Sequence, residues 1–139
     1  MTDIQSPTVQ AGLSPADMRV HLLDLRNFES LLPQGKVKDF VGSETSARFT
    51  IQGGVNIELS RPEDRTWADD GTLLLDGGGA PFSFHLTIRV AESSDSGDVC
   101  SADVLCSADL NPFLKMMAQK PLDALFSYIV SSLSRQFPI

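Results

Sequence analysis

Apolar and polar residues alternate along several short segments of the chain, and this period of two predicts β-strands. The alternation is clearest over residues 82–90, and it returns over 100–110 after a turn rich in Ser, Asp and Gly. Shorter segments with the same period precede them. Strands are therefore expected at residues 3–11, 37–42, 47–52, 55–60, 72–76, 82–90 and 100–110.

A helical period appears first after residue 14. Ser14 is a suitable N-cap and Pro15 suits the first helical position. Met18, Leu22 and Leu25 then follow at helical spacing, so their side chains share one face. The apolar pattern continues to residue 32, where a Pro-Gln-Gly sequence ends it. This segment predicts two short helices.

The longest helical pattern occupies the end of the chain. Asn111 and Pro112 form a start signal, and apolar residues then repeat at helical spacing to about Phe137. Pro121 lies inside this helix, where it removes a backbone donor and is expected to introduce a kink. The predicted apolar stripe comprises Leu114, Met117, Ala118, Leu122, Leu125, Ile129 and Leu133.

Together these elements predict a single α+β domain spanning residues 1–139. The order is one strand, two short helices, six strands and a long helix, which gives a curved sheet of seven antiparallel strands wrapped around the C-terminal helix. Alternate turns of an antiparallel meander lie at the same end of the sheet. Three connections are therefore expected to form one rim, a possible ligand portal. Its residues are Gly53, Gly54, Gly77, Gly78, Gly79, Asn111 and Phe113.

Three segments carry a resemblance to a known group of proteins. They read NFESLLP at residues 27–33, APFSF at 80–84 and ADLNPFLKMMAQKPL at 108–122. With the element order, they resemble a small bacterial branch of the START-like, or SRPBCC, superfamily, which includes the birch pollen allergen family and polyketide cyclases. The resemblance covers essentially the whole chain. The polar loop at 61–70 departs from it, because this loop is longer than the family pattern leads us to expect.

The resemblance implies the helix-grip fold and a hydrophobic cavity between the sheet and the long helix. Better known members of the superfamily bind sterols, lipids, plant hormones, polyketides or quinones, and a related group stimulates a chaperone ATPase. The branch has no assigned activity, so the resemblance provides no catalytic residue and no cofactor.

The charge balance narrows the choice of partners. The chain carries 11 Lys and Arg against 18 Asp and Glu, a net charge of −7, which disfavours nucleic acids and anionic membranes. The sequence shows neither a signal peptide nor a membrane-spanning run, so no membrane insertion and a cytoplasmic location are expected. Cys100 and Cys106 would lie about 20 Å apart on one strand, too far apart for a disulfide.

The sequence offers little catalytic chemistry. His21 and His85 are both expected to face solvent, and neither has a Cys or carboxylate cluster nearby, so no metal site is predicted. The acid pairs at 63–64 and 69–70 are typical of solvated turns. The glycines at 77–79 are not followed by the Lys-Ser/Thr of a phosphate loop.

Our leading hypothesis from the sequence is non-enzymatic binding or transport of a small hydrophobic or amphipathic ligand, such as a lipid, quinone or polyketide-like molecule. Two alternatives stay open: a cyclase or aromatase type of enzyme, and a protein-interaction module with a filled cavity. Trp67 is interpreted either as a surface anchor or as a lid. The predicted ligand-lining residues are Phe28, Leu32, Phe49, Ile57, Phe84, Leu86, Val104, Cys106, Met117, Leu125 and Ile129.

Overall fold

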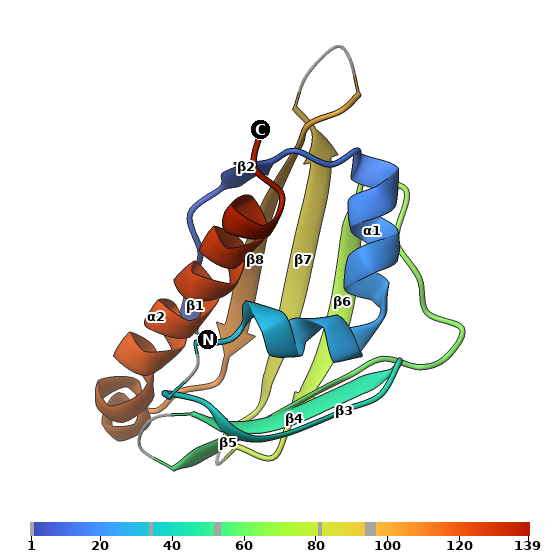
Figure 1. Cartoon of the computed structure of the whole chain (residues 1–139). Coiled ribbons are helices and arrows are strands. Elements are labelled where there is room, and N and C mark those ends of the chain that lie inside the picture. The colour runs from blue at the N-terminus through green and yellow to red at the C-terminus, as the bar shows by residue number, and fades with distance from the viewer. Residues whose placement is uncertain (1, 34, 52–53, 81, 94–96) are drawn as a thin grey trace.

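The structure, a computed structural model, describes residues 2–33, 35–51, 54–80, 82–93 and 97–139. One antiparallel sheet carries all the helices on its inner face (Figure 1). The elements in chain order are β1 (Thr2–Gln5), β2 (Val9–Ala11), α1 (Pro15–Leu23), the 3-10 helix η1 (Leu25–Leu31), β3 (Lys38–Gly42), β4 (Ser46–Ile51), β5 (Val55–Ser60), β6 (Thr72–Gly78), β7 (Phe84–Glu92), β8 (Cys100–Ala108) and α2 (Pro112–Gln136).

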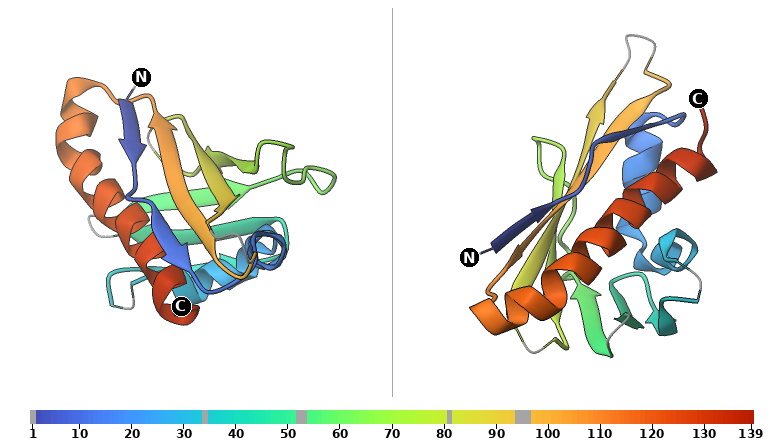
Figure 2. Two further views of the ribbon diagram at one scale, coloured as in Figure 1. Left: turned by 90° about the horizontal axis from the view of Figure 1, so that it is seen from above. Right: turned by 90° about the vertical axis from the view of Figure 1, so that its left-hand side faces the viewer.

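The sheet has the order β1-β8-β7-β6-β5-β4-β3, and β2 also pairs with β8. All these pairs are antiparallel. The long helix α2 runs diagonally across the inner face (Figure 2). This arrangement confirms the predicted α+β helix-grip fold.

The predicted first strand, 3–11, is divided into β1 and β2, so the sheet has eight strands rather than seven. Pro7 lies in the break and cannot donate a hydrogen bond. Ser6 closes the gap, because its N–H donates to the Val104 carbonyl at 2.9 Å and its Oγ accepts from the Val104 N–H at 2.8 Å. Thr8 is held by a hydrogen bond from its Oγ1 to Asp103 Oδ2 at 3.0 Å.

The two short helices have the predicted start signals. Ser14 Oγ accepts a hydrogen bond from the Asp17 N–H at 3.1 Å and caps α1. The break between the two predicted helices lies at Asp24, because the Asp24 carboxylate caps η1 by accepting from the Arg26 N–H at 3.1 Å. The apolar faces of both helices are buried against the sheet.

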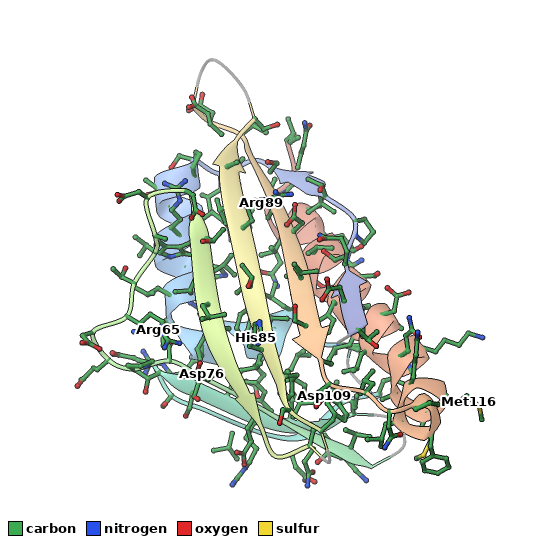
Figure 3. The ribbon with its side chains drawn as sticks, turned by 180° about the vertical axis from the view of Figure 1, so that it is seen from behind. Arg65, Asp76, His85, Arg89, Asp109 and Met116 are labelled. Atoms are coloured by element: carbon green, nitrogen blue, oxygen red, sulfur yellow. The ribbon has the colours of Figure 1, made fainter. Side chains whose placement is uncertain are left out.

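The long helix begins as predicted. Asn111 Oδ1 accepts a hydrogen bond from the Leu114 N–H at 2.8 Å, and Pro112 occupies the first turn. The buried stripe, however, starts at Ala118 and not at Leu114. Met117 is 53% exposed, because the first turns of α2 project past the sheet, as the position of Met116 shows in Figure 3.

The polar loop at 61–70 folds back onto α1. Trp67 packs against the core, and its indole Nε1–H donates to the Arg19 carbonyl at 2.9 Å. Arg61 Nε donates to the Leu23 carbonyl at 3.1 Å, a second attachment to the same helix. Trp67 is therefore an anchor for this loop.

The prediction that His21 faces solvent is wrong. Its ring packs edge-on against Phe137, with the centroids 5.3 Å apart, because the chain after α2 returns to α1. Phe137 is held there by its carbonyl, which accepts from the Gly12 N–H at 2.6 Å. His21 Nε2 is buried and has no hydrogen-bond partner among the described residues. His85, by contrast, lies on the outer face of the sheet as predicted (Figure 3).

Burial lowers the pKa of His21 below the ordinary value for a histidine, and the nearby Asp24 carboxylate only partly opposes this effect. The unfolded chain therefore binds the proton more tightly than the folded chain. We expect the free energy of unfolding to fall as the pH decreases below about 6.5. Urea unfolding between about pH 7.5 and pH 5 measures this loss.

The variant His21→Gln should reduce this pH dependence, whereas His85→Gln serves as the control and should preserve it. An equal slope in His21→Gln and the unmodified protein would contradict the assignment to His21.

Candidate functional site

An apolar cleft of about 250 Å³ opens between α2 and the end of β4. Four residues of α2 line one wall at spacings of three and four, which places them on a single helix face. Ile51 contributes from β4, and the chain between η1 and β3 closes the third side. The lining residues are Pro33, Lys36, Val37, Ile51, Pro121, Ala124, Leu125 and Tyr128.

The chain that closes the cleft is shaped by its own hydrogen bonds. The N–H groups of Lys36 and Val37 both donate to the Pro33 carbonyl, at 3.3 and 3.2 Å. Gly35 adopts a φ of +86°, a left-handed conformation that favours glycine. The turn holds Lys36 and Val37 against the cleft, so the lining combines an apolar surface with an ammonium group.

Tyr128 supplies a second polar group to the cleft. Arg135, two turns further along α2, lies with its guanidinium carbon 4.8 Å from the centre of the Tyr128 ring. Arg135 Nη2 donates to Ser132 Oγ at 2.9 Å, and this hydroxyl donates to the Leu31 carbonyl at 3.1 Å. These contacts connect Tyr128 to η1 and hold α2 close to the short helices.

Two further hollows share the chain at 33–38. One, of about 250 Å³, lies beside the same end of β4, between Lys36 and Gly54. The other, of about 500 Å³, lies between η1 and β3 and includes Leu32 and Phe40. This segment therefore separates three neighbouring openings at one corner of the molecule.

The structure gathers most of the predicted lining residues in one buried cluster between the sheet and the helices. Leu125 also lines the cleft, and Leu32 lines the hollow between η1 and β3. Met117 lies outside the cluster. The clustered residues are Phe28, Leu32, Phe49, Ile57, Phe84, Leu86, Val104, Cys106, Leu125 and Ile129.

The predicted rim residues are distributed over two places. The Asp109 N–H donates to the Ser83 carbonyl at 2.8 Å, which joins the start of α2 to the β6–β7 connection. Gly54 instead lines the hollow beside Lys36. Gly77 and Gly78 belong to β6, Gly79 follows them with a φ of +76°, and Asn111 caps α2. Phe113 is exposed, and Gly53 lies outside the described residues.

Sequence reasoning missed the contribution of Pro33, Lys36, Val37 and Tyr128. The Pro-Gln-Gly sequence predicted only the end of a helix, although a turn followed by a cation and an apolar residue between two elements was a usable signal. Tyr128 lies off the apolar stripe of α2, so the helical pattern did not predict it as a lining residue.

The remaining ionisable groups do not assemble a metal centre. Among the residues that the structure describes, no three His, Cys, Asp or Glu side chains lie together in a way that would hold a metal ion. Burial raises the pKa of the Cys106 thiol to about 12, and it also raises that of Cys100, so both thiols stay protonated at neutral pH. None of the described helices is long and apolar enough to cross a membrane.

Comparison with known proteins identifies the fold. The chain is similar to a START superfamily protein from Mycobacterium smegmatis (11% identity, 97% of this chain and 96% of that one, TM-score 0.70). It is also similar to the protein XoxI from Bacillus cereus (14% identity, 99% and 96%, TM-score 0.72). No protein-family model and no curated protein matches the sequence.

A third similar structure is norcoclaurine synthase from Thalictrum flavum in complex with dopamine and hydroxybenzaldehyde (14% identity, 97% of this chain and 85% of that one, TM-score 0.65). Similarities at this level of identity concern architecture. The chain therefore has a START-like helix-grip fold.

Proposed function

We propose that the protein binds a small hydrophobic or amphipathic molecule, without catalysis, in the cleft between α2 and β4. The observation that carries this proposal is the cleft lining, which is mainly apolar and has Lys36 and Tyr128 as its ionisable side chains. Apolar walls with a few polar groups are typical of small-molecule sites, where burial supplies affinity and the polar groups supply orientation.

The size of the cleft limits the ligand. Its volume of about 250 Å³ lies slightly below the usual range of roughly 300–1,000 Å³ for such sites. A lipid, quinone or polyketide-like molecule would therefore enter by its apolar end, and a longer ligand would displace the chain at 33–37. A similar fold supports the binding of small molecules, because norcoclaurine synthase has been solved in complex with dopamine and hydroxybenzaldehyde.

We place this binding in the cytoplasm. Cys100 and Cys106 are both free and buried, which suits a reducing compartment.

Filling the cleft should weaken ligand binding. Ala124 is exposed at the cleft, so Ala124→Trp can occupy the opening without entering the core. We expect this variant to weaken binding of 2-naphthol and decanoic acid about tenfold or more, because the apolar area available to the probe is lost. Titration followed by ¹H,¹⁵N NMR measures the affinity and locates the shifted amides.

The matched control is Asp123→Trp, since Asp123 is equally exposed but lies outside the cleft lining. The proposal fails if the unmodified protein binds neither probe at about 1 mM, or if both Trp variants bind equally well. Native mass spectrometry of protein incubated with a lipid extract then identifies a longer ligand by its mass.

A further inference from the structure

The strand β1 forms one edge of the sheet, and the direction of its backbone groups follows from its pairing with β8. Ser6 lies opposite Val104 in the register that pairs Gln5 with Leu105, and the Ser6 N–H donates to the Val104 carbonyl at 2.9 Å. In an antiparallel pair, residues that exchange hydrogen bonds alternate with residues that do not. Ile4 therefore bonds to β8, whereas the N–H and C=O groups of Asp3 and Gln5 point away from it.

The other side of β8 gives an independent check. The Asp109 N–H donates to the Ser83 carbonyl, so the odd-numbered residues of β8 bond to β7. The even-numbered residues of β8 then direct their backbone groups toward β1, in agreement with the Ser6–Val104 bond. The free edge of β1 thus presents two N–H donors and two C=O acceptors.

This edge borders a groove of about 450 Å³ whose other wall is α2. β1 lies between β8 and the first turns of α2 (Figures 2 and 3). The helix wall is formed by Met116, Gln119, Lys120 and Asp123, which share one helix face, together with Lys115. An edge strand facing a helix across a groove is the geometry in which extended peptides add a strand to a sheet.

Met116 of the helix wall and Phe113, which precedes it in the first turn of α2, are exposed apolar side chains. Met116 is 83% exposed and Phe113 is 66% exposed. Methionine is adaptable and is common at surfaces that accept varied apolar side chains. An extended segment that hydrogen-bonds to Asp3 and Gln5 would place alternate side chains against this surface.

The charges of the groove indicate the chemistry of the segment. Lys115 and Lys120 form no ion pair with any described residue. Residues 110–122 contain these two lysines and no acid, in a chain whose net charge is −7, and Asp123 follows them directly. The Asp3 carboxylate already accepts a hydrogen bond from Ser107 Oγ at 3.0 Å. The helix wall also carries Asp123, so its three charges sum to +1. Lys115 and Lys120 are the two groups on this wall that complement a carboxylate.

We propose that the groove between β1 and α2 binds an extended segment of a partner protein by strand addition, with acidic and apolar side chains alternating along that segment. The backbone of the segment pairs with Asp3 and Gln5. Its apolar side chains contact Met116, and its carboxylates face Lys115 and Lys120.

Hydrogen exchange tests the geometry of the free protein. The amides of Asp3 and Gln5 should exchange quickly, and the amide of Ile4 should be protected by its bond to β8. Protection of Asp3 and Gln5 in the free protein would show that the edge is already closed, and it would overturn the proposal.

The peptide acetyl-Val-Glu-Val-Glu-Val-Glu-amide serves as the binding probe. At a peptide concentration of about ten times Kd, exchange at Asp3 and Gln5 should slow about tenfold, and Ile4 should change little. The same peptide N-methylated at alternate residues cannot form the strand bonds and should not bind. The double variant Lys115→Glu, Lys120→Glu should weaken binding roughly tenfold, and Lys38→Glu, on the opposite edge strand, is the control.

No binding of the parent peptide at about 1 mM would overturn the proposal. It would also be overturned by equal binding of the N-methylated peptide, which would show an interaction with side chains alone.

Discussion

Replacing Phe49 by Ala should lower the free energy of unfolding by about 3–5 kcal/mol, the usual cost of deleting a fully buried aromatic ring. Phe49 is 1% exposed and lies on the inner face of β4, two residues before Ile51 of the cleft. The loss combines the transfer free energy of the ring with the cavity left behind. Urea unfolding of the full chain at neutral pH measures it.

The control for this variant is Phe40→Ala. The Phe40 ring stacks on Phe49 with the centroids 6.2 Å apart, but it lies on the edge strand β3 and is only partly buried. We expect a loss of about 1–2 kcal/mol there, since less apolar area leaves water. Similar losses in the two variants would contradict the view that the core beneath the cleft is closely packed around Phe49.

The Phe49→Ala variant also separates two roles for the buried cluster. If the cluster only fills the interior, the deletion should cost stability and leave the affinity for 2-naphthol unchanged. An increased affinity would show that the ligand site extends inward from the cleft along β4.

The variant Gly77→Ala should lower the free energy of unfolding by about 2–3 kcal/mol through overpacking. A Cβ at this position would lie 2.5 Å from the backbone carbonyl oxygen of Phe84 and equally close to the Phe84 ring. The carbonyl oxygen cannot move without shifting β7, so the strain falls on the sheet. Thermal and urea unfolding both report the loss.

Gly78 provides a matched control from the next residue in the same strand. A Cβ there meets only the Glu58 side chain, with Oε2 at 3.5 Å, which is ordinary contact. Gly78→Ala should be neutral or stabilising by up to about 1 kcal/mol, because Ala restricts the unfolded chain. A loss above 1 kcal/mol in Gly78→Ala would show that the shared turn, rather than the contact with Phe84, causes the effect.

The fold could be predicted from the sequence because the patterns that indicate its helices and strands are local and agree with one another. Ser14 and Asn111 are N-caps whose hydrogen bonds need no tertiary contact, and Pro112 suits the first helical turn through its fixed φ. Alternation with a period of two likewise follows from the geometry of each strand. The division of the first strand into β1 and β2 was harder to predict. Pro7 cannot donate to a neighbouring strand, but only the pairing of β2 with β8 and the Ser6–Val104 bonds show that the chain continues along the same neighbour.

The candidate site was less predictable, because it depends on where elements end relative to one another. Periodicity assigned Met117 to the apolar face of α2, but it carries no information on how far the helix extends past the sheet. Lys36 and Tyr128 line one opening although they are distant in the sequence. His21 is half-buried, and it packs against Phe137, which is more than a hundred residues later in the chain.

Pro121 gives α2 two parts with different local stability. Its missing N–H leaves the Met117 carbonyl without the usual helical donor, and the buried stripe of the helix starts just beyond that carbonyl, at Ala118. Residues 112–117 are held by the Asn111 cap and by the partly buried Leu114, whereas the remainder of α2 is fixed by many buried side chains. We therefore expect the first turns to open locally more often than the rest of α2, and such openings would change the width of the groove beside β1 without loss of the native fold.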